Sequence, residues 1–117
     1  PFYQMLTLCS PRTKTRFNVW VLFDDGAMTS VMSSRIYHEA RNMVDGWQPA
    51  RRNMRMANGQ VVPSKASWAG DFVLEGIVKF GTFEVLEQDG GWDFLLGNPM
   101  LRAFQAVHEY ATDVIRI

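Results

Sequence analysis

The stretch Val21-Leu22-Phe23-Asp24-Asp25-Gly26-Ala27 carries the strongest structural signal in this sequence of 117 residues. It ends the apolar run Phe17 to Phe23, which is rich in Val, Trp and Phe and predicts a strand buried on both faces. A carboxylate directly after such a strand is costly unless it is paired, hydrogen-bonded or protonated. Gly26 allows either close approach of the backbone or a positive φ. Taken alone, the stretch is better explained as an ordinary Asp-Gly turn with two solvated acids.

The composition indicates one globular domain. Hydrophobic residues make up 47% of the chain, which excludes a disordered protein. No apolar run approaches the roughly 20 residues of a membrane-spanning helix, so no membrane partner is expected. Cys9 is the single cysteine, which excludes an internal disulfide and favours an intracellular, cytoplasmic location. The chain starts at Pro1, which predicts excision from a longer polyprotein.

The charge is balanced, with 12 Lys and Arg against 12 Asp and Glu. A net charge of zero argues against a general nucleic-acid-binding protein. Arg51, Arg52 and Arg55 are close enough in sequence to form a basic patch for RNA or an acidic partner. No aromatic residues are interleaved with them, so a solvated face is the favoured interpretation and no direct nucleic-acid contact is expected.

Alternation and turn signals predict a mostly β chain. Asn58-Gly59 separates two alternating segments, Arg52 to Ala57 and Gln60 to Trp68, which is a strong hairpin signal. Turns are predicted at Glu75-Gly76 and at Gly81. Short apolar runs predict the other strands: Phe2–Leu8, Phe72–Leu74, Val78–Phe80, Phe83–Leu86, Trp92–Leu96 and two strands within Ala106–Ile117.

Two short helices are also predicted. Apolar residues fall on one helical face from Arg35 to about Val44, and Ser33 or Ser34 can cap that helix. Asn98 as the cap and Pro99 at the first helical position predict a second helix, from about Met100 to Gln105. The expected fold class is therefore all-β with one or two short helices.

Three segments in this order resemble the retropepsin family of aspartic proteases. They are Phe23-Asp24-Asp25-Gly26-Ala27, Met56-Ala57-Asn58-Gly59-Gln60 and Phe94-Leu95-Leu96-Gly97-Asn98-Pro99-Met100-Leu101. Each segment is weak alone, but the three in this order are fairly specific. The resemblance covers most of the chain, from about Phe17 to Ile117. It is closest to the protease domain of Ty3/gypsy-type retrotransposon polyproteins, and it extends to the retropepsin-like domain of ubiquitin-linked DNA-damage-inducible proteins.

The resemblance implies a closed β barrel over residues 1–117 that forms one subunit of a homodimer. Asp24 takes the position of the catalytic aspartate, and Asp25, Gly26 and Ala27 complete the active-site loop. Two carboxylates about 3 Å apart cannot both be ionised, so the two Asp24 side chains would share a proton. The ionised one would take a proton from water and the protonated one would polarise the peptide carbonyl, which predicts an acid optimum.

The resemblance also gives roles to the other two segments. Ala57, Asn58 and Gly59 would form a flap that closes over a polypeptide substrate bound in extended form. Leu96 and Gly97 would lie under the active-site loop, where Gly97 provides clearance. The implied function is an aspartic endopeptidase that processes a retrotransposon Gag-Pol type polyprotein, in the cytoplasm or within virus-like particles. No metal or organic cofactor is expected, and Pro1 would mark a self-cleavage junction.

Position 25 departs from the family pattern, which has Ser or Thr after the catalytic aspartate. In a dimer, Asp24 and Asp25 would bring four carboxylates close to one axis, which is unfavourable in a low dielectric. Asp25 could be protonated and donate the missing hydrogen bond, could pair with a nearby Arg, or could destabilise the dimer near neutral pH. The third is the preferred hypothesis. Asp25 itself is a poorer catalytic candidate, because the motif would then lack its residue before Gly26.

Two other functions stay open. A non-proteolytic retropepsin-like domain would keep the fold as a dimerisation or peptide-binding module, with Asp25 as a sign of decay. An unrelated small β barrel that binds a partner is the second alternative. Intact Asp24, Gly26 and Ala27 favour the protease. Met28 and Met32 are candidates for lining the cavity near Asp24.

Overall fold

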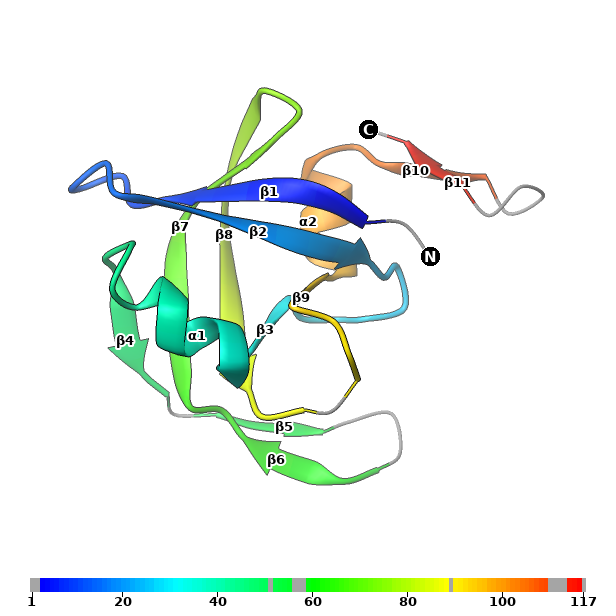
Figure 1. Ribbon diagram of the computed structural model, residues 1–117. Helices are drawn as coiled ribbons and strands as arrows, with labels where there is room; N and C mark the ends of the chain where they lie inside the picture. The colour runs from blue at the N-terminus through cyan, green and yellow to red at the C-terminus, as the bar shows by residue number, and fades with distance from the viewer. Residues whose placement is uncertain (1–2, 51, 56–58, 89, 110–113, 117) are drawn as a thin grey trace.

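The computed structural model describes residues 3–50, 52–55, 59–88, 90–109 and 114–116 (Figure 1). The chain is mostly β with two short helices, as predicted. The strands are β1 (Tyr3–Cys9), β2 (Arg16–Phe23), β3 (Val31–Ser33), β4 (Trp47–Pro49), β5 (Asn53–Arg55), β6 (Val61–Pro63), β7 (Ala66–Leu74), β8 (Ile77–Leu86), β9 (Phe94–Leu96), β10 (Val107–Glu109) and β11 (Val114–Arg116). The helices are α1 (Ser34–Ala40) and α2 (Asn98–Ala103), which lie on opposite sides of the molecule (Figure 1).

Strands β1, β2, β9, β3, β8 and β7 close into a barrel. They are hydrogen-bonded neighbours in that order, and β7 pairs back onto β1 through Asp71–Val73. The other end of β7 pairs with β4. Two contacts are parallel, β2 with β9 and β3 with β8, so segments far apart in the sequence lie side by side. Closure leaves the ring without the exposed edges of an open sheet.

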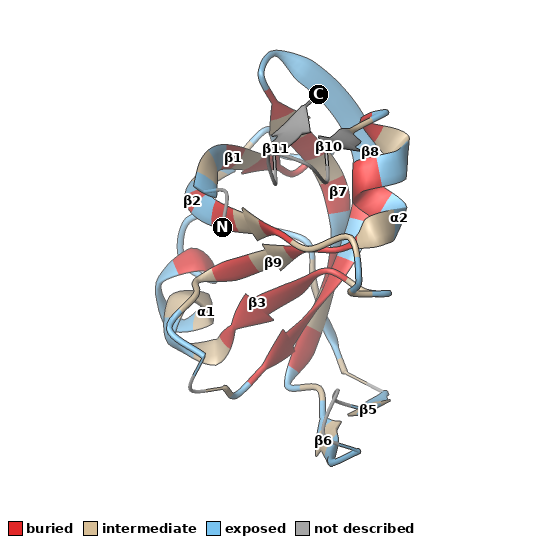
Figure 2. Ribbon diagram, turned by 90° about the vertical axis from the view of Figure 1, so that its right-hand side faces the viewer, coloured by how far each residue is buried: buried red, intermediate tan, exposed pale blue. Residues whose placement is uncertain are grey.

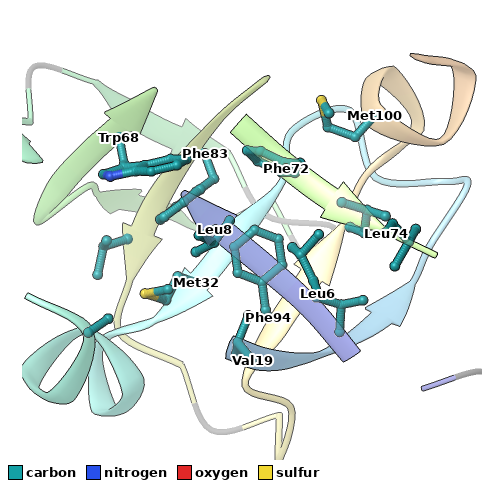
Figure 3. Packing of buried hydrophobic residues seen from close by; sticks show 14 of the residues in the cluster. Leu6, Leu8, Val19, Met32, Trp68, Phe72, Leu74, Phe83, Phe94 and Met100 are labelled. Carbon is teal, nitrogen blue, oxygen red and sulfur yellow. The ribbon is translucent and has the colours of Figure 1, made fainter. Parts of the chain in front are cut away.

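Four aromatic rings fill the centre of the barrel (Figure 3). Trp68, Phe72, Phe83 and Phe94 are each 1% exposed or less. Phe83 lies between the others, with its ring centroid 5.3 Å from Trp68, 6.1 Å from Phe72 and 5.0 Å from Phe94. The indole N–H of Trp68 donates to the carbonyl of Asp45 at 2.8 Å, so the one polar group of this cluster is satisfied.

The long hairpin of β7 and β8 corrects two sequence predictions. Phe72–Leu74 is the end of β7 and not a separate strand, and the turn predicted at Gly81 is wrong because β8 runs through it. A Cβ at Gly81 would collide with the sulfur of Met100, so glycine here lets α2 pack closely against the strand. The turn at Glu75-Gly76 is confirmed, with φ values of 51° and 78°.

Both helices differ from their predicted bounds. Helix α1 ends at Ala40 and not near Val44, although Ser33 caps it as expected by accepting from the N–H of Arg35 at 3.3 Å. For α2, the predicted cap at Asn98 is wrong, because Gly97 is the N-cap and no side chain caps the helix. Among the described residues, no helix has the length and apolar character needed to cross a membrane.

The hairpin predicted around Asn58-Gly59 is present as β5 and β6, with Met54 opposite Val62. Its second arm was expected to continue from Gln60 to Trp68 as one strand, which is wrong. The chain changes partner at Ser64 and Lys65, where Ser64 N donates to Arg52 O and Lys65 N donates to Val85 O. Two three-residue strands, β3 and β4, were not predicted, because they are too short to show a periodicity.

Phe83→Ala should lower the free energy of unfolding by about 3–5 kcal/mol, because it opens a cavity between three other rings. Phe80→Ala is the matched control on the same strand, since Phe80 is 64% exposed and its loss should cost less than about 0.5 kcal/mol. Denaturant unfolding measures both values. Equal losses would contradict the central position of Phe83.

Candidate active site

The loop after β2 turns sharply and orients one carboxylate. Asp24 is half-buried, and its carbonyl accepts from the N–H of Ala27 at 3.2 Å. The N–H of Gly26 donates to Asp24 Oδ1 at 3.0 Å. A Cβ at Gly26 would lie 3.3 Å from the same oxygen, and Gly26 does not have a positive φ. Close approach to the carboxylate is therefore what this glycine provides.

The end of β9 and the start of α2 hold the loop of residues 24–30 by hydrogen bonds. Three consecutive residues supply one hydrogen bond each: Asp24 N to Leu96 O (3.0 Å), Gly97 N to Ser30 Oγ (3.0 Å) and Asn98 N to Ala27 O (2.7 Å). Ser30 is 3% exposed, so its bond to Gly97 is shielded from water. The loop is thus fixed at its start, its middle and its end.

Gly97 leaves no space for a side chain. A Cβ at this position would lie 2.9 Å from the carbonyl oxygens of Ala27 and Thr29. Both contacts are to backbone, which cannot rotate away as a long side chain can. The structure therefore places Gly97, together with Leu96, directly against the loop that carries Asp24.

A cavity of about 420 Å³ opens over Asp24. Its apolar wall comes from Val31 on β3, Leu86 on β8 and Leu95 on β9, and Met54 and Arg55 of β5 line it from the hairpin. Asp24 is the single carboxylate among the described residues that line it. Figure 2 shows buried residues concentrated on β3, β8 and β9, with the β5–β6 hairpin standing apart from them.

Of the two methionines that were expected to line the cavity near Asp24, one does and the other does not. Met28 lines the cavity and is 74% exposed. Met32 does not line it, because the alternation of β3 turns Met32 into the fully buried core and Val31 toward the cavity. The prediction for Met32 is therefore wrong.

The hairpin segment predicted as a flap is described in part. Ala57 and Asn58 lie outside the described residues. Gly59 has a φ of 84°, which favours glycine, and its carbonyl accepts from Arg55 Nη1 at 3.3 Å. Because Met54 and Arg55 also line the cavity, this hairpin forms one of its walls.

Sequence reasoning missed several residues of the site. Ser30, which holds the N–H of Gly97, lies in an irregular segment where no periodicity marks it. Met54, Arg55 and Leu86 line the cavity but read as ordinary strand residues. Within the described part of the chain, no group of three or more His, Cys, Asp or Glu side chains is placed to hold a metal ion.

One carboxylate in an apolar cavity can take up or release a single proton. Hydrolysis of a peptide bond by carboxylates alone requires two of them in opposite protonation states, one to activate water and one to polarise the carbonyl. The described cavity of one chain supplies Asp24 alone for this purpose. For such chemistry, the site of one chain is half of what is required.

Comparison with solved structures shows which fold this is. The chain is similar to EIAV protease in complex with the inhibitor HBY-793, with a TM-score of 0.67 and 17% identity over 89% of this chain and 88% of that one. It is also similar to the retroviral protease-like domain of Ddi1 from Leishmania major, with a TM-score of 0.64 and 19% identity over 98% of this chain and 86% of that one. No family model and no curated protein matches the sequence. The retropepsin-like fold predicted from the sequence is confirmed.

Gly97→Ala should destabilise the protein by about 1–3 kcal/mol, because the added methyl group must displace the backbone of the Asp24 loop. Asn98→Ala is the matched control, since the Asn98 side chain does not cap α2 and only its backbone N–H holds the loop. Thermal unfolding compares the two variants. A loss at Asn98 as large as that at Gly97 would contradict the role of clearance at Gly97.

Proposed function

We propose that this chain is an aspartic endopeptidase that acts as a homodimer, with one Asp24 from each subunit. The observation that carries the proposal is the Asp24 carboxylate, which Gly26 orients at the base of a cavity lined by Val31, Leu86 and Leu95. The likeness in fold to EIAV protease supports the same reading. A second copy of the loop, related by a two-fold axis, would supply the missing carboxylate.

Each residue then has a defined part in hydrolysis. The ionised Asp24 takes a proton from a water molecule while the protonated Asp24 donates a hydrogen bond to the peptide carbonyl oxygen. The water oxygen attacks the carbonyl carbon, and the proton held by the dyad then passes to the leaving nitrogen. The hydrogen bond from Gly26 keeps the acceptor oxygen in place, so less reorganisation is needed during the reaction.

The substrate would be a polypeptide in extended form, held between the loop and the β5–β6 hairpin. We place its natural source in a retrotransposon polyprotein of the Ty3/gypsy Gag-Pol type, processed in the cytoplasm or within virus-like particles. The support for this finer assignment is the resemblance of the sequence segments around Asp24, Gly59 and Gly97 to that group.

A peptide-binding or dimerisation module without proteolytic activity is the second candidate. The observation that favours it is Asp25, which stands where the family pattern has Ser or Thr. The intact family motif of Asp24, Gly26 and Ala27 favours the enzyme.

Asp24→Asn should lower the rate of peptide cleavage by about 10²–10⁴-fold, because an amide cannot exchange the proton that general acid–base catalysis requires. Cleavage of a mixed peptide library at mildly acid and neutral pH, followed by mass spectrometry, measures this rate. Asp45→Asn is the control, since Asp45 is exposed and lies outside the cavity. Unchanged cleavage in the Asp24 variant would exclude the proposed mechanism, and a confirmed dimer that cleaves nothing would favour the binding module.

Asp25→Ser should strengthen the dimer at neutral pH. Ionised Asp25 side chains near a two-fold axis repel each other, and their repulsion grows as the pH rises and the carboxyl groups lose protons. We expect the dissociation constant of the wild-type dimer to increase about tenfold from mildly acid to neutral pH, which corresponds to about 1.4 kcal/mol. The serine variant should lose this dependence. Analytical ultracentrifugation measures both proteins, and a wild-type constant that does not change with pH would rule the hypothesis out.

A further inference from the structure

Glu84 on β8 is a buried carboxylate that the proposed reaction does not use. Its relative exposure is 5%, and its Oε1 atom has no hydrogen-bond partner among the described residues. The ion pairs in that part of the chain are Arg35–Asp93 and Lys65–Glu87, and neither involves Glu84. A buried carboxylate oxygen without a partner is costly, so its retention calls for a reason.

The alternation of β8 fixes the side to which Glu84 points. Phe83 and Val85 belong to the core cluster, so Glu84 lies on the opposite face of the strand, together with Thr82 and Leu86. Leu86 lines the cavity over Asp24, and Thr82 lines a neighbouring cavity of about 490 Å³. Glu84 therefore lies between two residues that each face a cavity.

The pairing of the strands places Glu84 in one row with the cavity wall. Val31 is its partner on β3, and Leu95 on β9 is the partner of Val31. Paired residues of adjacent strands point to the same face of a sheet. Leu95 and Val31 both line the cavity over Asp24, so Glu84 lies in the same row one strand further, between the linings of the two cavities but in neither of them. At about 4.8 Å per strand, it lies about 10 Å from Leu95.

The two arginines that line these cavities leave this acceptor open. Arg55 lines the Asp24 cavity and Arg52 lines the neighbouring one, and neither forms an ion pair with Glu84. Arg55 instead donates to the carbonyl of Gly59. A strong donor to this oxygen would then have to come from a molecule that binds in the adjoining cavities.

We propose that Glu84 forms a subsite that accepts an Arg or Lys side chain of the polypeptide substrate. A guanidinium or ammonium group would supply charge-assisted hydrogen bonds to the unpartnered oxygen. In an extended peptide, about 3.3 Å per residue places this basic side chain within about three residues of the cleaved bond. The inference rests on the proposed endopeptidase function, because it names the substrate that the same cleft would select.

The first test is a cleavage profile from a peptide library randomised around the cleaved bond. The peptides that the wild type cleaves should be enriched in Arg and Lys at one position within about three residues of the cleaved bond. In a symmetric dimer, the equivalent position on the other side of the bond should be enriched as well. Glu84→Gln should reduce this enrichment about tenfold, because the amide keeps the shape of the side chain but not its charge. Glu87→Gln is the matched control, since Glu87 is exposed and pairs with Lys65. A wild type without basic preference, or a Glu84→Gln profile equal to wild type, would overturn the proposal.

The second test is stability without substrate. If Glu84 serves a ligand, Glu84→Leu removes a buried carboxyl group with an unpartnered oxygen and should raise Tm by about 4 °C or more. If Glu84 instead supports the fold, Glu84→Leu should lower Tm. The Glu84→Gln variant should then cleave with the same preference as the wild type. That combination would contradict the subsite.

A peptide-binding measurement separates a failed endopeptidase function from a failed Glu84 subsite. If the wild type cleaves nothing, the endopeptidase function fails. The affinity for peptides then tests whether Glu84 binds a basic side chain. Asp24→Asn protein would be titrated with two peptide pools that carry either Arg or norleucine at the positions beside the centre. About tenfold tighter binding of the Arg pool, lost on adding Glu84→Gln, would support the subsite. Equal binding of the two pools, or none, would overturn it.

Discussion

The hydrogen bonds that Leu96, Gly97 and Asn98 make to the loop at Asp24 are the constraint from which the site follows. These bonds join the end of β9 to the loop at the end of β2, so the two strands must run in parallel. Two parallel neighbours can be connected only through a long crossover. The strands from β3 to β8 form that crossover, and the closed barrel places the end of β9 against the loop. Gly97 is then required, because the loop and the strand approach to within the space of one methyl group.

The aromatic core and the cleft occupy opposite faces of the same strands. On β3, Met32 packs in the core and Val31 faces the cavity, and on β8 the same division separates Val85 from Leu86. A rigid core behind the cleft holds its floor in place. The β5–β6 hairpin lacks such backing, since its described side chains are exposed or half-buried.

The sequence predicted the elements whose signal is local. Asp24, Gly26 and Gly97 stand in short motifs, and the Asn58-Gly59 hairpin follows from turn chemistry, so their general arrangement could be inferred. Features set by tertiary packing could not be. Gly81 resembles a turn but faces Met100, and Asn98 resembles a helix cap but is used through its backbone. Glu84 gave no signal at all, because its burial depends on the pairing of β8 with β3.

The bond between Gly97 and Ser30 joins positions 67 residues apart. Closing a loop of this length costs conformational entropy, which the contacts at its ends must repay. The loop that orients Asp24 can be completed only after the chain has been synthesised past Asn98, because residues 96–98 supply its hydrogen bonds. A nascent chain would therefore carry the Asp24 carboxylate long before the residues that hold it in place have been added.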